Sequence, residues 1–132
     1  MGVNRKLLIV AFAAALAGVG AAPAQPALKG LMREKLGHSQ KIFEAVVTSD
    51  WASLELHTRR LQQLTNDPRW AMLRYPEFAR HSAEFQQALD ALHEAAAQRD
   101  LEKTPAAFNA MTLRCVECHR SLARGRIADA GR

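Results

Sequence analysis

Two cysteines and a histidine stand together near the end of the chain, in the run Cys115-Val116-Glu117-Cys118-His119. This C-x-x-C-H pattern is the attachment signature of a c-type haem, whose two vinyl groups form thioethers with the two thiols. On a helix, residues i and i+3 lie on nearly the same face and residue i+4 lies beside them. We therefore predict one haem c, bound covalently through Cys115 and Cys118, with His119 as an axial ligand of the iron.

Other uses of the cysteine pair fit this sequence less well. A thioredoxin-like C-x-x-C belongs at the start of a helix that follows a strand, and the sequence has no strand pattern. A structural zinc site needs four ligands, commonly in two pairs, and there is no second pair. A disulfide between two residues one helical turn apart would constrain very little.

The first 24 residues have the layout of a secretory signal peptide. Arg5 and Lys6 provide a positive start, residues 7–18 are apolar or small, and Ala22-Pro23-Ala24 fits the small-x-small pattern that signal peptidase cleaves. The apolar stretch is short of the roughly 20 residues of a membrane span, so a retained anchor is the weaker alternative. We expect cleavage after Ala24, export to the periplasm, and no stable membrane insertion of the mature domain, residues 25–132.

The charge of the chain indicates a solvated surface and gives no sign of nucleic-acid binding. The 132 residues include 18 Lys and Arg and 13 Asp and Glu. Loss of Arg5 and Lys6 with the signal peptide lowers the formal net charge from +5 to +3. The remaining basic residues form no run and are scattered among acidic ones.

The mature sequence predicts an all-α fold, because Ala, Leu, Glu, Gln and Arg dominate and apolar residues recur with helical rather than strand spacing. Four helices with mostly short connections predict an up-down-up-down antiparallel bundle with the haem on the last helix. The expected helices cover about 26–47, 51–65, 76–98 and 104–124, and the tail from Gly125 is expected to fray. Four aromatic residues at core spacing are expected to wall the haem pocket: Phe43, Phe78, Phe85 and Phe108.

The position of the motif narrows the class of cytochrome. Only 13 residues follow His119, and they include neither Met nor His, so a second protein ligand must come from upstream. With its C-x-x-C-H on the last of four helices, the chain resembles the cytochrome c′ family, including its low-spin, methionine-ligated branch. It departs from that family three and four positions after the ligand histidine. An aromatic and then a basic residue are common there, whereas this chain has Leu122 and Ala123, with Arg120 and Arg124 nearby.

Met32 is the residue that we expect on the opposite side of the iron. In such a bundle the first and last helices are antiparallel neighbours, and Met32, about five residues into its helix, lies level with His119. Met32 is also near the centre of the apolar stripe of its helix. The stripe consists of Leu28, Met32, Leu36, Phe43 and Val46. The resemblance implies that this first-helix position meets the distal haem face, where a methionine can bind iron.

Alternatives remain for this sixth position. An inward-facing methionine is commonly only core filler, and the position could be open. His38 lies about 9 Å further along the helix axis and to one side of the stripe, while His81 and Met72 are at plausible heights. Met111, one turn before Cys115, is expected to pack against the porphyrin without reaching the iron.

These features together predict a periplasmic monohaem c-type cytochrome that carries single electrons. A His119/Met32 pair would keep the iron low-spin. The alternative is a five-coordinate or ligand-displaceable haem protein that binds NO or CO, as the resemblance implies when no strong sixth ligand is present. No nucleophile–base pair or acidic dyad is conspicuous, so we do not expect an enzyme. The expected partners are redox proteins, and the resemblance leaves a homodimer open.

Overall fold

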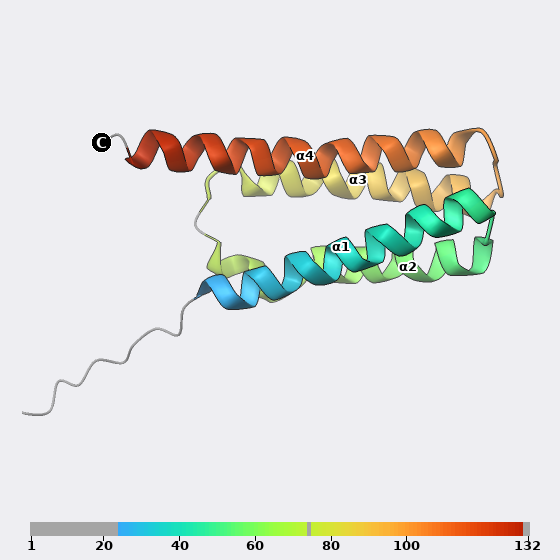
Figure 1. Ribbon diagram of the computed structural model, residues 1–132, viewed down its shortest axis with the longest axis horizontal. Coiled ribbons are helices and arrows are strands. Elements are labelled where there is room, and N and C mark those ends of the chain that lie inside the picture. Colours follow the sequence, from blue (N-terminus) through green and yellow to red (C-terminus); the bar gives the residue numbers. More distant parts are fainter. Residues whose placement is uncertain (1–23, 74, 131–132) are drawn as a thin grey trace, which may run out of the picture.

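The computed structural model describes residues 24–73 and 75–130, and side chains within 27–73 and 75–125. Its elements are α1 (Ala24–Thr48), α2 (Trp51–Thr65), the short 3-10 helix η1 (Pro68–Met72), α3 (Phe78–Ala97) and α4 (Lys103–Ala130). The four α-helices run alternately up and down (Figure 1). The predicted all-α four-helix bundle is therefore confirmed. The signal-peptide prediction falls, except for Ala24, outside the described residues.

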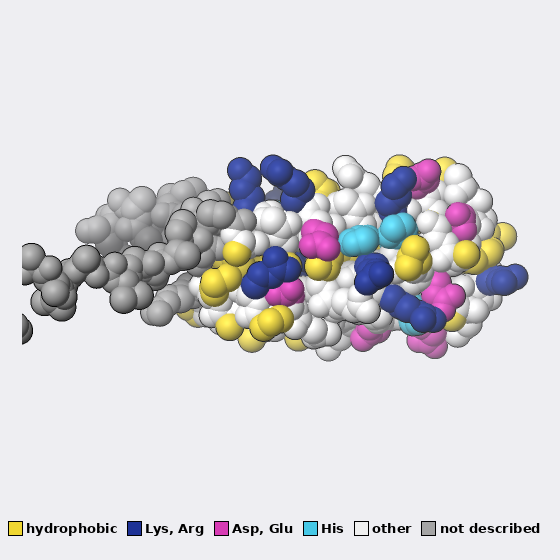
Figure 2. All heavy atoms as spheres, turned by 90° about the horizontal axis from the view of Figure 1, so that it is seen from below, with side chains coloured by type: hydrophobic (Ala, Val, Ile, Leu, Met, Phe, Trp, Pro, Cys, Tyr) yellow, Lys and Arg dark blue, Asp and Glu magenta, His cyan; other side chains and the backbone are white. Residues whose placement is uncertain are grey.

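The four helices do not pack equally closely against their neighbours. α1 and α2 form one layer and α3 and α4 the other, as Figure 1 shows. Consecutive helices pack closely, whereas α1 and α4 make the fewest contacts of the four neighbouring pairs. None of the described helices is both long and apolar enough to cross a membrane, and basic and acidic side chains are interspersed on the face that Figure 2 shows. The seam between α1 and α4 is therefore the least filled part of the bundle.

The two turns that connect α1 to α2 and α3 to α4 have the same construction. Ser49 and Arg99 adopt left-handed backbone conformations, with φ of 54° and 51°. The next residue in each turn, Asp50 or Asp100, donates its N–H to a carbonyl in the last turn of the preceding helix (2.9 and 3.1 Å). Its carboxylate accepts the N–H three residues further on (3.1 and 2.8 Å). Each turn thus ends one helix and caps the next within two residues.

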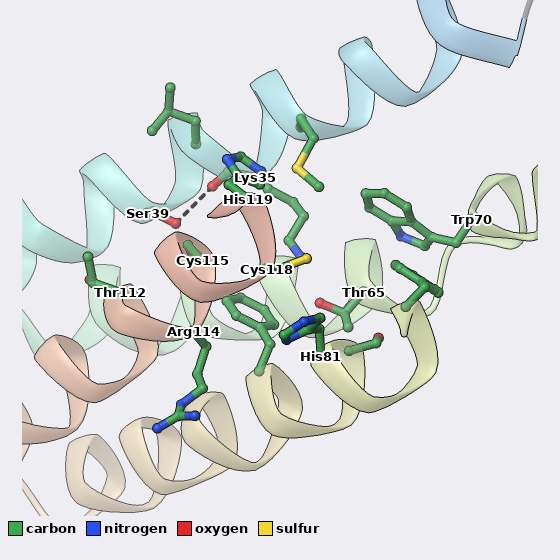
Figure 3. A pocket seen from close by; sticks show the side chains of 15 residues that line it. Lys35, Ser39, Thr65, Trp70, His81, Thr112, Arg114, Cys115, Cys118 and His119 are labelled. Atoms are coloured by element: carbon green, nitrogen blue, oxygen red, sulfur yellow. Dashed lines mark hydrogen bonds between the residues drawn. The ribbon is translucent and has the colours of Figure 1, made fainter. Parts of the chain in front are cut away.

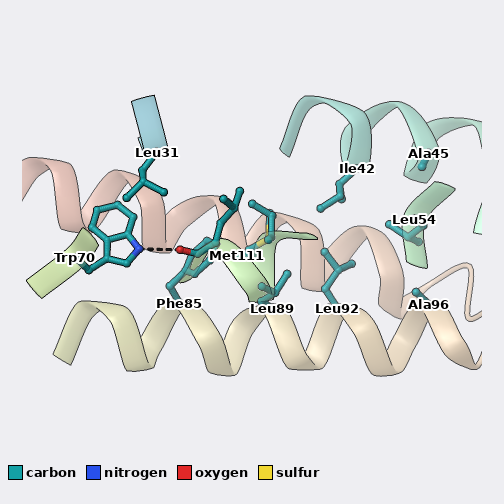
Figure 4. Packing of buried hydrophobic residues seen from close by; sticks show 12 residues of the cluster. Leu31, Ile42, Ala45, Leu54, Trp70, Phe85, Leu89, Leu92, Ala96 and Met111 are labelled. Carbon is teal, nitrogen blue, oxygen red and sulfur yellow. Dashed lines mark hydrogen bonds between the residues drawn. The ribbon is translucent and has the colours of Figure 1, made fainter. Parts of the chain in front are cut away.

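The core is built from aliphatic side chains together with the aromatic rings of Trp70 and Phe85. Leu31, Ile42, Leu89 and Met111 are completely buried, and Figure 4 shows Trp70 at one end of the same cluster. Burial of such side chains stabilises the fold by roughly 1.5–3 kcal/mol each relative to exposure. The cluster runs along the bundle but does not fill the space beside the middle of α4.

Two sequence predictions are wrong in detail. Leu36 and Phe43 were expected to face the core, but they are 59% and 57% exposed. The reason is that α1 packs mainly on α2, so it buries the face that carries Leu31 and Ile42 and turns the predicted stripe towards the sparse α1–α4 seam. In addition, α4 does not end near Arg124. It continues to Ala130 through Gly125, because arginine and alanine around this single glycine favour the helix.

Candidate functional site

A cavity of about 190 Å³ lies inside the bundle, beside the middle of α4. Every helical element contributes to its wall, including Met32 from α1, Trp70 from η1, Phe85 from α3 and Cys115 from α4. Figure 3 shows these elements surrounding the space. The lining is mainly hydrocarbon and aromatic, as in sites that bind an apolar ligand.

The three residues of the C-x-x-C-H motif share this wall. Cys115, Cys118 and His119 all line the cavity; the cysteines are free thiols and partly buried, while His119 is largely exposed. Burial raises the pKa of both thiols, and the nearby ammonium of Lys35 opposes this shift. The helical geometry expected from the spacing is therefore present: two neutral thiols and an imidazole line one apolar space.

The two methionines predicted to meet a haem have different surroundings. Met32 is partly buried and lines the cavity from α1, whereas His119 lines it from α4. Met111 is completely buried in the core cluster and is not among the side chains that line the cavity. Met72, an alternative ligand, is 41% exposed on η1 and does not line the cavity either. The roles of Met32 and Met111 towards a haem stay predictions.

The histidines considered as alternative ligands are held elsewhere or by their own helix. His38 does not line the cavity, and its Nδ1 lies 2.9 Å from Nδ1 of His57 on α2. His81 does line the cavity, and it is buried. Its Nε2 lies 3.1 Å from the Arg80 guanidinium and its Nδ1 lies 3.4 Å from the Glu84 carboxylate. His81 is therefore restrained by α3 side chains.

Aromatic rings close one end of the cavity. Trp70 stacks on Phe78 with the ring centroids 5.4 Å apart, and its indole N–H donates to the Leu64 carbonyl oxygen (2.7 Å). Of the four phenylalanines expected in the pocket, Phe78 and Phe85 line it. The other two, Phe43 and Phe108, pack against each other at 5.8 Å between centroids and do not line it. Trp70 was not predicted to line the cavity, because it lies in a connection between helices.

Lys35 is a charged cavity residue that the sequence did not single out. Its ammonium lies 4.0 Å from the centroid of the Phe85 ring and 5.4 Å from that of Trp70. Burial lowers the pKa of Lys35, against the opposing effect of Cys115 and Cys118. On a helical wheel at ~100° per residue, Lys35 falls between the buried face and Met32. This position on the wheel was the one indication in the sequence that Lys35 faces inward, but charged residues were interpreted as part of the solvated surface.

A second, polar cleft of about 480 Å³ adjoins the cavity, and His81 lines both spaces. Arg80, Arg120 and Arg124 line this cleft together with Glu77. Hydrogen bonds, first from Ser121, lower the pKa of Glu77. The two basic residues noted near the motif in the sequence, Arg120 and Arg124, therefore face a cleft that could receive an anionic group.

This arrangement of helices has counterparts among solved structures. One is a ferrous variant of cytochrome c′ from Alcaligenes xylosoxidans with bound NO: the TM-score is 0.64 and the identity 23%, over 74% of this chain and 91% of that one. Another cytochrome c′ gives a TM-score of 0.63 and 25% identity, over 76% and 96%. The fold is that of cytochrome c′. No family model and no curated protein matches the chain. The structural resemblance to cytochrome c′ predicted from the motif is confirmed, and the methionine-ligated branch stays a prediction.

Proposed function

We propose that the chain is an exported c-type cytochrome that carries one covalent haem and transfers single electrons in the periplasm. One observation carries the proposal. The two thiols and the imidazole of the C-x-x-C-H motif and, from α1, the Met32 side chain all line one apolar cavity of the cytochrome c′ fold.

The residues present fit a haem. Cys115 and Cys118 would hold the porphyrin covalently, and His119 and Met32 would bind its iron. The bound haem supplies an Fe(III)/Fe(II) couple. Trp70, Phe78 and Phe85 line the space and would exclude water from it, which favours the less charged ferrous form.

The surroundings of the motif suit electron transfer to a partner protein. Cys118 is only partly buried and His119 is largely exposed, so the attached edge would lie close to the surface. The apolar side chain of Val116, on the outer side of the motif, is 41% exposed. A redox partner could therefore approach this edge closely without a conformational change. The periplasmic location rests on the signal-peptide pattern in residues 1–24.

The first experiment tests the ligand pair in holoprotein from a host that attaches haem c. The oxidised protein should show low-spin features and a weak band at about 695 nm, which is typical of methionine ligation. Met32→Ala should abolish this band. Met72→Ala is the matched control, because Met72 is exposed and lies outside the cavity. A high-spin spectrum that Met32→Ala leaves unchanged contradicts the proposed ligand pair.

A second experiment tests attachment itself. Mass spectrometry should show an addition of about 616 Da to the mature chain. Cys115→Ser with Cys118→Ser should remove it. A wild-type chain without this mass contradicts the whole proposal.

Binding of a diatomic gas is the alternative function. It is favoured by the similar cytochrome c′ structure, which contains bound NO. If Met32 leaves the iron five-coordinate, the ferrous protein should bind CO at once and stoichiometrically. A bound methionine should slow CO binding, and Met32→Ala should then accelerate it.

A further inference from the structure

Lys35 presents an unusual combination of charge and surroundings. Its ammonium extends into the cavity, as Figure 3 shows, and lies over the Phe85 ring at 4.0 Å. No carboxylate in the described part of the chain forms an ion pair with it. Lys35 is partly buried, and a charge withdrawn from water without a counter-ion costs free energy that a ring face only partly offsets. The fold therefore gains little stability from a lysine at this position.

Lys35 lies close to the predicted iron ligand Met32. It follows Met32 by one helical turn, and both side chains line the cavity from α1. Cys115 and Cys118 line the same cavity from α4. A porphyrin attached to these cysteines would therefore occupy the space that the Lys35 ammonium now occupies, and the side chain would meet its distal face or leave the cavity.

We propose that Lys35 Nζ is an alternative axial ligand of the iron, available on the same side as Met32 when the methionine is displaced. This inference rests on the proposed haem site. Binding requires that the ammonium releases one proton to solvent, after which its nitrogen lone pair can bind the metal, and no electron is transferred in this step. The apolar surroundings favour the neutral amine. His81 is a weaker competitor, because Arg80 and Glu84 restrain both of its ring nitrogens.

The test compares four haem-loaded proteins: wild type, Met32→Ala, Lys35→Arg and the double variant. Arginine is the matched control, because it keeps the charge and most of the length of lysine but stays protonated and cannot bind iron. Absorption and electron paramagnetic resonance spectra of the oxidised proteins are recorded at about pH 7 and about pH 9, below the ordinary lysine pKa. Far-UV circular dichroism verifies that each variant is folded.

We expect Met32→Ala to lose the 695 nm band yet remain largely low-spin with nitrogen ligation, at one or both pH values. The double variant should be high-spin, with the low-spin fraction reduced about tenfold or more. Lys35→Arg alone should keep the methionine band. The inference is overturned if Met32→Ala is already high-spin at both pH values, or if the double variant stays low-spin, since another residue such as His81 would then be the ligand.

The failure of this inference is distinguishable from that of the proposed function. A haemochrome assay reports whether haem is attached at all, and a chain without haem overturns both proposals. If the wild type contains haem but lacks the methionine band, only the Met32 assignment fails. The comparison of Met32→Ala with the double variant then still decides the role of Lys35.

Discussion

Trp70→Phe tests whether the short helix η1 is held to the bundle by a single buried indole. Trp70 is only 6% exposed, and its N–H donates to the Leu64 carbonyl oxygen at 2.7 Å (Figure 4). After the substitution this carbonyl keeps a long hydrogen bond from the Asp67 N–H, at 3.3 Å. Loss of the indole hydrogen bond costs about 1 kcal/mol. The smaller ring leaves a gap that costs roughly 1–2 kcal/mol more.

The holoprotein should therefore lose about 2–3 kcal/mol of unfolding free energy, which corresponds to a decrease in melting temperature of roughly 10 °C. Urea unfolding followed by far-UV circular dichroism measures this directly. Trp51→Phe is the control, since Trp51 is only partly buried and its indole N–H makes no hydrogen bond within the described residues. If the two variants differ by less than about 0.5 kcal/mol, the argument from the hydrogen bond and the filled space is wrong.

Three further changes test separate features. Burial, followed by the charge of His38, lowers the pKa of His57, so the native state resists a proton that the unfolded chain accepts. The melting temperature should fall as the pH decreases from about 7.5 to about 5.5, and His57→Asn should flatten that slope; an unchanged slope contradicts this reasoning. Arg99→Gly should raise the unfolding free energy by about 0.5–1 kcal/mol, because glycine adopts a φ of 51° without strain, whereas Arg99→Ala should not. Thr104 is 2% exposed and its hydroxyl has no hydrogen-bond partner among the described residues, so Thr104→Val should be neutral or stabilise by up to about 1 kcal/mol. Thr58→Val, which removes a 2.9 Å hydrogen bond to a carbonyl, should destabilise instead, and equal effects of the two valines would refute the distinction.

The helix pattern was predictable where the sequence has explicit caps. The bounds of α2, Trp51–Thr65, agree with those expected, because Asp50 caps its start and the run before Pro68 ends it. α3 begins at Phe78 rather than at Pro76, since the residues around Pro76 form a turn before the helix. The cluster of the two thiols and the imidazole was predictable because it depends only on spacing within one helix.

The buried face of α1 and the position of Lys35 depend on how neighbouring helices pack. The periodicity of a single helix carries no information about this packing. α1 has an apolar stripe, but contact with α2 determines which face is buried, so Leu36 and Phe43 are exposed, although Leu36 still lines the cavity. Lys35 was missed for the same reason. A lysine counts as surface in any pattern of polar and apolar residues, and only the tertiary arrangement shows that its ammonium lies over Phe85.

The weak seam between α1 and α4 has a mechanical consequence. Both cysteines belong to α4, so thioether bonds alone would connect a cofactor to one side of the seam. A bond from an α1 side chain to the iron would then link the two sides. When that bond opens, the start of α1 should be held less firmly, although the helix stays packed on α2. Amide hydrogen exchange in the first half of α1 should then report the state of the metal, while the amides of α3 remain protected.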